Sequence, residues 1–270
     1  MSSQPATSVA HGDETLLLRR DESGVATLTL NRPRHYNALS VGLMSALQGE
    51  LDLIREDAAV RVVVIEGAGK GFCAGHDLKE IRGGGGRPFF EAVFQQCSRL
   101  MVSVTRLPQP VIAKVHGIAT AAGCQLVASC DLAVAAETAR FGTPGVNIGL
   151  FCSTPMVALS RAVPRKQAME MLLGGEMIDA ATAVAYGLAN RAVPDQDLDG
   201  AVSDLAGKIG GKSSHVLKIG KEAFYRQIEL GLEEAYAYAS QVMTTNMLAR
   251  DAEEGIDAFI EKRPPVWEGR

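Results

Sequence analysis

Four consecutive β-branched residues, Val62 to Ile65, stand in the first quarter of the chain. A strand that is apolar on both faces needs cover on both sides, so this run predicts a central strand with helices packed against each face. Segments 110–115 and 131–136 are also typical of strands, and a segment with helical spacing, 89–105, lies between the first two. Strands joined by crossover helices predict a largely parallel, layered α/β fold.

The pattern divides the chain into three regions. Residues 1–13 are small and polar and are expected to be disordered, without the charged and apolar pattern of a signal peptide. Residues 14–196 carry the strand signals, including a pair at 14–20 and 25–30, and a helix that Ser40 would cap. Residues 197–270 show helical spacing only, with Asp251 and Glu254 in a capping-box pattern, and predict an all-helical module.

Composition excludes several classes of protein. A formal net charge of −4 argues against a nucleic-acid binder, which usually has a basic footprint. The apolar stretch 111–136 contains Lys114, His116 and Asp131, which favours a buried core over a membrane span. The five cysteines are odd in number without a C-x-x-C pair, and no two histidines have metal-ligand spacing, so we expect reduced thiols in the cytosol and no metal site.

Two segments share one local design, in which a strand leads through small residues into a helix. One runs from 62–65 into Ala74 and Gly75, and the other from 111–115 into Ala122 and Gly123. A helix start leaves backbone N–H groups without partners and carries partial positive charge. Two such sites that met on one oxygen would form an oxyanion hole, but spacing alone does not show that they meet.

Ordered motifs along the chain resemble the crotonase superfamily, the enoyl-CoA hydratases and isomerases. They are Asn31-Arg32-Pro33 with Asn37-Ala38-Leu39, the segments 72–80 and 116–126, Phe141-Gly142-Thr143-Pro144, and 255–263. The resemblance extends from about Glu14 to Trp267. It implies a ββα spiral core that binds acyl-CoA, followed by a C-terminal all-helical trimerisation region, with a trimer or hexamer as the assembly.

The resemblance also implies roles for particular residues. The backbone N–H groups of Ala74 and Ala122 would hold the thioester oxygen. Alanine at position 122, where the family usually has glycine, keeps that donor but requires an ordinary right-handed φ. Coenzyme A arrives as part of the substrate, so no separate cofactor is implied. The residues expected to contact it are His35, Tyr36, Asn37, Ala38, Gly75, His76, Asp77, Leu78, Gly123, Phe259 and Lys262, the last two often across a subunit boundary.

The two glutamates of a classical enoyl-CoA hydratase are missing. By resemblance their positions are Gln125 and Gly145. The side-chain amide of Gln125 does not act as an acid or base near neutral pH, and Gly145 has no side chain. General acid–base groups contribute about 10²–10⁴-fold each, so hydration by that route should be very slow.

Three interpretations remain open. The chain is an enzyme of another enolate reaction (isomerisation, decarboxylation or thioester hydrolysis), a weak hydratase of fatty acid β-oxidation, or a non-catalytic acyl-CoA-binding protein. Gln125 is the first candidate for polar contact with substrate or water, followed by Cys152, Ser153 and Thr154 in the loop beside the reacting carbon. The favoured interpretation of Cys152 is a small buried hydrophobe, and His76, Asp77 and Asn147 are also interpreted as structural residues.

Overall fold

A seven-stranded sheet forms the centre of the molecule, in the order β1-β2-β3-β4-β5-β7-β10. The structure is a computed structural model that describes residues 8–10 and 15–270. Strands β3 to β10 run parallel to their neighbours, whereas β1, β2 and β3 pair antiparallel. The strands are β1 Ser8–Ala10, β2 Thr15–Glu22, β3 Val25–Leu30, β4 Val62–Gly67, β5 Val111–Val115, β7 Leu132–Ala136 and β10 Arg191–Val193.

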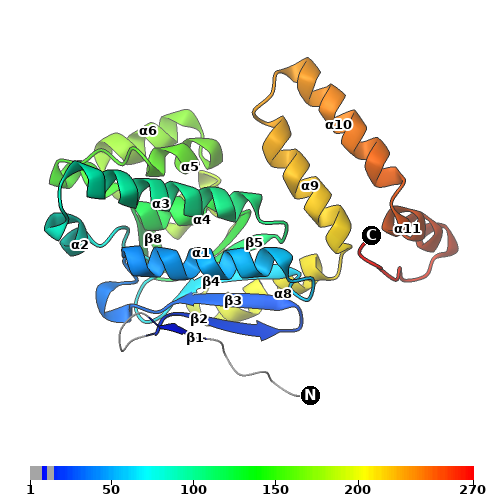
Figure 1. The fold of residues 1–270 in the computed structure, drawn as a ribbon, viewed down its shortest axis with the longest axis horizontal. Coiled ribbons are helices and arrows are strands. Elements are labelled where there is room, and N and C mark those ends of the chain that lie inside the picture. Colours follow the sequence, from blue (N-terminus) through cyan, green and yellow to red (C-terminus); the bar gives the residue numbers. More distant parts are fainter. Residues whose placement is uncertain (1–7, 11–14) are drawn as a thin grey trace.

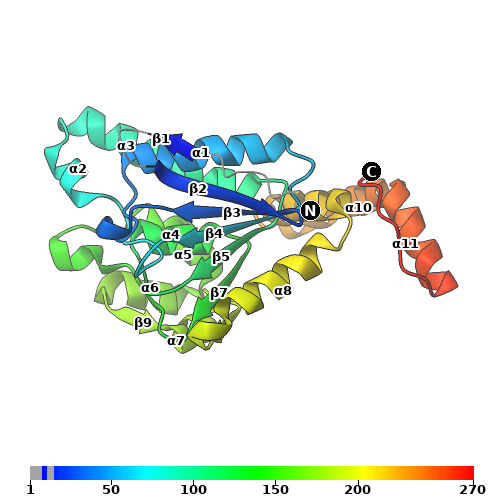
Figure 2. The same ribbon diagram turned by 90° about the horizontal axis from the view of Figure 1, so that it is seen from below.

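The valine run lies in β4 and is buried from both sides, as predicted. Val63 and Ile65 join the larger apolar core, which includes α1 (Val41–Glu56), α3 (Arg87–Arg106) and α4 (Ala122–Ser129). Val62 and Val64 face the other way and pack with Leu198 and neighbouring side chains of α8 (Leu198–Gly210). Figures 1 and 2 show the sheet between these layers, with α1 and α8 on opposite sides.

Three-residue strands make a second sheet that the sequence did not predict. It has the order β6-β8-β9, with β6 Ile118–Thr120, β8 Arg140–Gly142 and β9 Met177–Asp179. Such strands are too short for an alternating pattern to emerge. Helices α2 Leu78–Gly83, α5 Pro155–Ala162, α6 Arg165–Gly174 and α7 Ala180–Ala185, with the 3-10 turns η1 Pro33–His35, η2 Pro144–Ile148 and η3 Asp195–Asp197, complete this part.

Helices α9 Ser214–Gln227, α10 Leu232–Met247 and α11 Arg250–Glu261 project from this body as an arm (Figures 1 and 2). The arm is anchored where the Lys221 ammonium reaches the Asp131 carboxylate at 2.6 Å and Tyr225 donates to the same carboxylate at 2.9 Å. No residue of α9 or α10 is fully buried. Every named element after residue 197 is a helix, which confirms that prediction.

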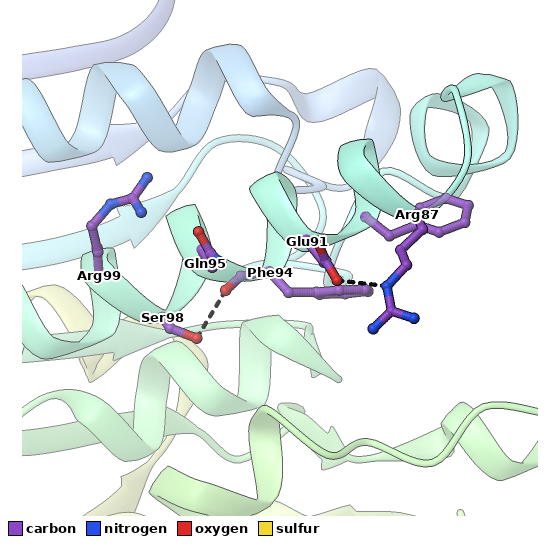
Figure 3. A pocket seen from close by; sticks show the side chains of 7 residues that line it. Arg87, Glu91, Phe94, Gln95, Ser98 and Arg99 are labelled. Carbon is purple, nitrogen blue, oxygen red and sulfur yellow. Dashed lines mark hydrogen bonds and ion pairs between the residues drawn. The ribbon is translucent and has the colours of Figure 1, made fainter.

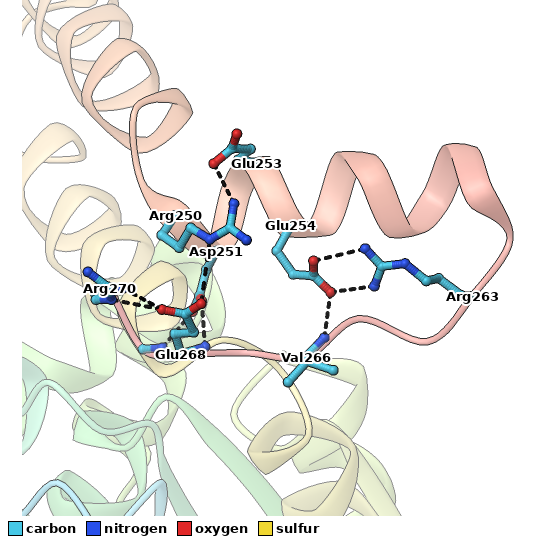
Figure 4. A network of polar contacts seen from close by, with 9 residues as sticks. Arg250, Asp251, Glu253, Glu254, Arg263, Val266, Glu268 and Arg270 are labelled. Carbon is cyan, nitrogen blue, oxygen red and sulfur yellow. Dashed lines mark hydrogen bonds and ion pairs between the residues drawn. The ribbon is translucent and has the colours of Figure 1, made fainter.

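The capping-box interpretation of Asp251 and Glu254 was wrong. Helix α11 begins at Arg250 after Ala249, which offers no side-chain cap. The Asp251 carboxylate instead accepts from the backbone N–H groups of Glu268 and Gly269, at 2.7 and 3.0 Å. Glu254 pairs with Arg263 and accepts from Val266 N (Figure 4). Both carboxylates therefore hold the C-terminal tail against α11.

The N-terminal prediction was wrong at one place. Within residues 1–13, which were predicted to be disordered, Ser8–Ala10 form β1 and pair with β2. The rest of that segment lies outside the described residues. None of the described helices combines the length and apolar character that crossing a bilayer requires.

Candidate functional site

The two segments that resemble oxyanion loops lie side by side. Cys73 and Ala119 form a parallel bridge, in which Cys73 N donates to Ile118 O at 3.0 Å and Thr120 N donates to Cys73 O at 2.9 Å. These bonds place the turn after Cys73 against the start of α4. The segments therefore converge, which spacing could not establish.

Two glycines allow this close approach. A Cβ atom at position 123 would lie 2.1 Å from the Cys73 carbonyl oxygen, so no larger residue fits there without moving the backbone. Gly75 has a φ of +90°, and a Cβ atom there would lie 3.0 Å from Thr120 O and 3.3 Å from Ala122 N. Position 75 therefore needs glycine for both conformation and space.

The strained backbone at the start of α4 lies at Ala121, one residue before the alanine that stands where the family usually has glycine. Ala122 is the first helical residue, which agrees with the right-handed conformation predicted for it. Ala121 before it has φ 49° and ψ −116°, a region that alanine rarely adopts. Its methyl side chain accepts no hydrogen bond, so Ala121 does not cap the N–H groups of the first turn.

The Ala74 amide does not serve as the first donor in this structure. Ala74 N donates to the Tyr36 carbonyl oxygen at 2.9 Å, which uses its only proton. The positive φ of Gly75 then changes the direction in which successive backbone N–H groups point along this segment. Asp77 N also faces the preceding segment and donates to Leu39 O, whereas no backbone carbonyl of the described residues accepts from His76 N.

His76 and Ala122 are among the residues of these two segments whose amides have no backbone acceptor in the described part of the chain, a property that Gly75 and Gly123 share. Ala122 is fully buried, and buried amides without an acceptor are rare in native proteins. The sequence analysis missed the His76 amide because a turn with one positive φ decides which neighbouring N–H is free.

Gln125 lies one turn further along α4 and is 4% exposed. Its side-chain oxygen is 3.9 Å from the Cys97 sulfur of α3, within reach of a weak S–H hydrogen bond. The amide keeps this residue neutral in a site where a carboxylate would need a charged partner. Its predicted role in contacting a substrate or water stays a prediction.

Gly145 and Cys152 occupy the same small space. A Cβ atom at position 145 would lie 2.5 Å from Leu150 O and 2.9 Å from the Cys152 sulfur. Burial raises the pKa of the Cys152 thiol, so the sulfur is protonated at neutral pH. This favours the small buried hydrophobe over a thiolate nucleophile. Asn147 of the same turn donates to Gly175 O at 3.1 Å, a packing contact.

An open groove of about 800 Å³ runs along α3 next to this site, lined by Arg87, Phe90, Glu91, Phe94, Gln95, Ser98 and Arg99. Figure 3 shows Glu91, Phe94 and Ser98 projecting from the same side of the helix. Glu91 is a carboxylate that sequence reasoning did not single out. It pairs with Arg87 at 2.7 Å and its side chain is 54% exposed, so it is an ordinary solvated ion pair.

His76 connects the groove to the two amides. Its ring packs edge-on against Phe94, with ring centroids 5.5 Å apart. Its Nε2 atom is buried without a hydrogen-bond partner among the described residues. Burial lowers the pKa of the imidazole to about 4, so the ring is neutral near pH 7.

This pKa predicts a specific dependence of stability on pH. Unfolded histidine titrates near pH 6.5, so below that pH the unfolded chain binds a proton that folded His76 does not. The free energy of unfolding should therefore fall as pH drops from about 6.5 towards 4. We expect His76→Leu to remove about 1 kcal/mol of the loss between pH 6.5 and 5. Urea unfolding at pH 7, 6 and 5 measures this, and an unchanged slope in the variant would contradict it.

The family is decided by comparison with known proteins. The sequence family described as enoyl-CoA hydratase/isomerase matches residues 20–270. The chain belongs to the enoyl-CoA hydratase/isomerase family. Its crotonase fold is that of solved members: a Mycobacterium smegmatis enoyl-CoA hydratase is 53% identical with a TM-score of 0.92, and covers 94% of this chain and 99% of its own. The human enoyl-CoA hydratase domain-containing protein 3 is 46% identical with a TM-score of 0.91, over 93% and 100%.

A curated relative corrects the predicted location. The rat enoyl-CoA hydratase domain-containing protein 3 is 47% identical over 248 residues, which are 92% of this chain and 83% of the rat protein, and it is named as mitochondrial. Relatives from mouse, Xenopus laevis and human at 45–47% identity carry the same word. The prediction of a cytosolic protein was wrong, because reduced cysteines do not distinguish the cytosol from other reducing compartments.

Several residues that the family resemblance assigned to CoA have structural partners in this enoyl-CoA hydratase/isomerase family member. The Asn37 side chain is buried and makes three hydrogen bonds, from Arg32 N and to Ala68 O and Gly71 O. Asp77 caps α2 and pairs with Arg32 at 2.8 Å, which lowers the pKa of its carboxyl despite burial. Asn37 and Asp77 therefore stabilise this turn through hydrogen bonds and an ion pair within the chain.

The remaining CoA candidates of the family fall into two groups. His35, Tyr36 and Leu78 are exposed beside that turn, with Ala38 buried behind them. Phe259 is 84% exposed and Lys262 ends α11, on the arm and away from α2 in Figures 1 and 2. Within one chain the second group does not lie with the first, which fits the expectation of contact across a subunit boundary.

Proposed function

We propose that this protein binds a fatty acyl-CoA thioester and stabilises its enolate with the backbone N–H groups of His76 and Ala122, without efficient classical hydration. The observation that supports the proposal is that the two segments lie side by side and that the amides of His76 and Ala122, the latter at the start of α4, have no backbone acceptor among the described residues. Negative charge that develops on a thioester oxygen is favoured by two N–H donors and by the helix N-terminus. No metal or redox cofactor enters the proposal.

The lost acid–base pair restricts the reaction. Gln125 and Gly145 supply no carboxyl group, and the Cys152 thiol is protonated near neutral pH. A polarised thioester still has more acidic α-protons, which buffer bases can remove. We therefore favour isomerisation or decarboxylation through an enolate, or thioester hydrolysis through a tetrahedral oxyanion, over addition of water to a double bond, with slow hydration as the alternative.

Exchange of α-protons tests this proposal. Butyryl-CoA incubated in D₂O should gain deuterium at the α-carbon faster with the protein than without it, as mass spectrometry of the recovered thioester would show. Under the same conditions crotonyl-CoA hydration should stay at least about 10²-fold below the rate of a family member with both glutamates. Hydration at the rate of such a member would overturn the proposal.

A second candidate is acyl-CoA binding without chemistry. The observation that favours it is that His76, Cys152 and Gln125 are all buried or partly buried and neutral near the proposed thioester site. Saturable binding of butyryl-CoA without any deuterium gain would select this function over the first.

We also propose that the arm carries self-association as a trimer or hexamer. Leu232, Tyr236, Leu248 and Phe259 are at least 70% exposed, which is unusual for large apolar side chains on one helical module. Burial of this surface in a trimer would bring Phe259 and Lys262 to a neighbouring subunit.

A further inference from the structure

We propose that the His76 imidazole selects acyl-CoA thioesters that carry a hydroxyl group on the third acyl carbon, which would hydrogen-bond to Nε2. This inference rests on the proposed function, because it places the thioester oxygen on the amide of the same residue. It adds a residue that determines specificity and the chemical class of acyl group that this residue recognises.

The first argument is an unmet hydrogen bond. His76 Nε2 has no partner among the described residues although solvent does not reach it. A buried polar atom without a partner costs about 1–3 kcal/mol, so a fold retains one where a ligand completes it. Other described histidines lack this feature; the ring of His116, for example, contacts Gly69 O at 3.0 Å.

The second argument is position. Gly75, the residue before His76, packs against the start of α4, where a Cβ atom on it would lie 3.3 Å from Ala122 N, and the His76 ring meets Phe94, a lining residue of the α3 groove. A group that pairs with this ring therefore lies within a few bonds of the thioester. Nε2 is the ring nitrogen farther from the backbone, so it suits an oxygen on the third carbon better than one on the second.

The third argument is charge. Burial against Phe94 disfavours the imidazolium and keeps the ring neutral near pH 7. A neutral ring nitrogen either donates or accepts according to its tautomer, and a hydroxyl group matches both states. The same low basicity makes the ring a weak proton acceptor, which favours recognition over general-base catalysis.

Paired ligands that differ by one oxygen test the inference. Isothermal titration calorimetry would measure binding of butyryl-CoA and 3-hydroxybutyryl-CoA to the full chain. We expect the wild-type protein to bind the hydroxylated thioester at least about 10-fold more tightly, because the butyryl group leaves Nε2 unpaired.

Two substitutions make the test specific. His76→Leu keeps the amide and removes the ring nitrogens, so the ratio of the two affinities should fall to about one. His76→Gln places an amide near the Nε2 position and should restore part of the preference. His215→Leu makes the same change on α9 at a histidine that is also partly buried, and should leave the preference unchanged.

These outcomes distinguish the role of the His76 ring from the proposed acyl-CoA binding on which it rests. Equal affinity of the wild-type protein for both thioesters, or an unchanged preference in His76→Leu, would overturn the role of His76 and leave acyl-CoA binding intact. Failure of both thioesters to bind the wild-type protein would overturn the proposed function together with it.

Discussion

Replacing Ala122 with proline is expected to slow α-proton exchange in butyryl-CoA by about 10²–10³-fold, the effect of removing one oxyanion donor. Ala122 is the first residue of α4, where proline is tolerated because its missing N–H has no partner within the helix. The substitution removes the proposed donor without removing a hydrogen bond of the helix, but Ala121 before it, at φ 49° and ψ −116°, lies outside the extended region that precedes proline, so retention of the helix has to be measured. Mass spectrometry of the thioester in D₂O, with circular dichroism of the variant, measures both.

Ala180→Pro is the matched control. Ala180 is also a buried alanine at the first position of a helix, α7, and Asp179 before it has an extended conformation that suits a following proline. This variant should exchange at the wild-type rate. A folded Ala122→Pro protein that exchanges at the same rate as Ala180→Pro would remove Ala122 from the oxyanion site.

The layered core could be predicted from the sequence because positions buried on both faces of a sheet are occupied by apolar residues. The run from Val62 to Ile65 indicated cover on both faces, and in the structure alternate valines join different apolar clusters. Ser40 as a helix cap followed from its hydroxyl, which accepts from Leu43 N at 3.1 Å. The strands β6, β8 and β9 could not be predicted, since three residues carry no measurable period.

The site could be predicted to the level of segments but not of atoms. Motifs identified both loops, yet the choice between the amides of Ala74 and His76 depends on which side of the chain each N–H faces. That direction is set by the φ of Gly75 and by the bond from Ala74 N to Tyr36 O. Asn37 was assigned to CoA by resemblance, whereas its side chain is used inside the fold. A motif match identifies a residue as important but does not show which group its side chain contacts.

Restoring the two missing carboxyl groups is expected not to restore hydration, because position 145 has no room for a side chain. Even a Cβ atom there would lie 2.5 Å from the Leu150 carbonyl oxygen, which is backbone and moves only with the turn. That turn is closed by a hydrogen bond from Leu150 N to Gly145 O at 2.9 Å. The chain has thus lost the space as well as the glutamate.

Gly145→Ala measures the cost of this contact. We expect it to lower the free energy of unfolding by about 1–3 kcal/mol, the usual penalty of overpacking a core. The control is Gly49→Ala in α1, where a Cβ atom meets nothing within 4 Å and where alanine should stabilise the helix by about 0.5–1 kcal/mol. The two substitutions add the same methyl group, so urea unfolding should give changes of opposite sign.

The catalytic consequence follows from the same geometry. Gln125→Glu alone supplies one carboxyl group in a site that is 4% exposed, where burial favours its neutral form. Gln125→Glu with Gly145→Glu supplies the second only by displacing Leu150 O or the Cys152 sulfur. Crotonyl-CoA hydration by either variant should therefore stay within about tenfold of wild type, against the 10²–10⁴-fold that each well-placed group contributes. A double variant of wild-type stability whose hydration rises by several orders of magnitude would show that the turn opens to accept the glutamate.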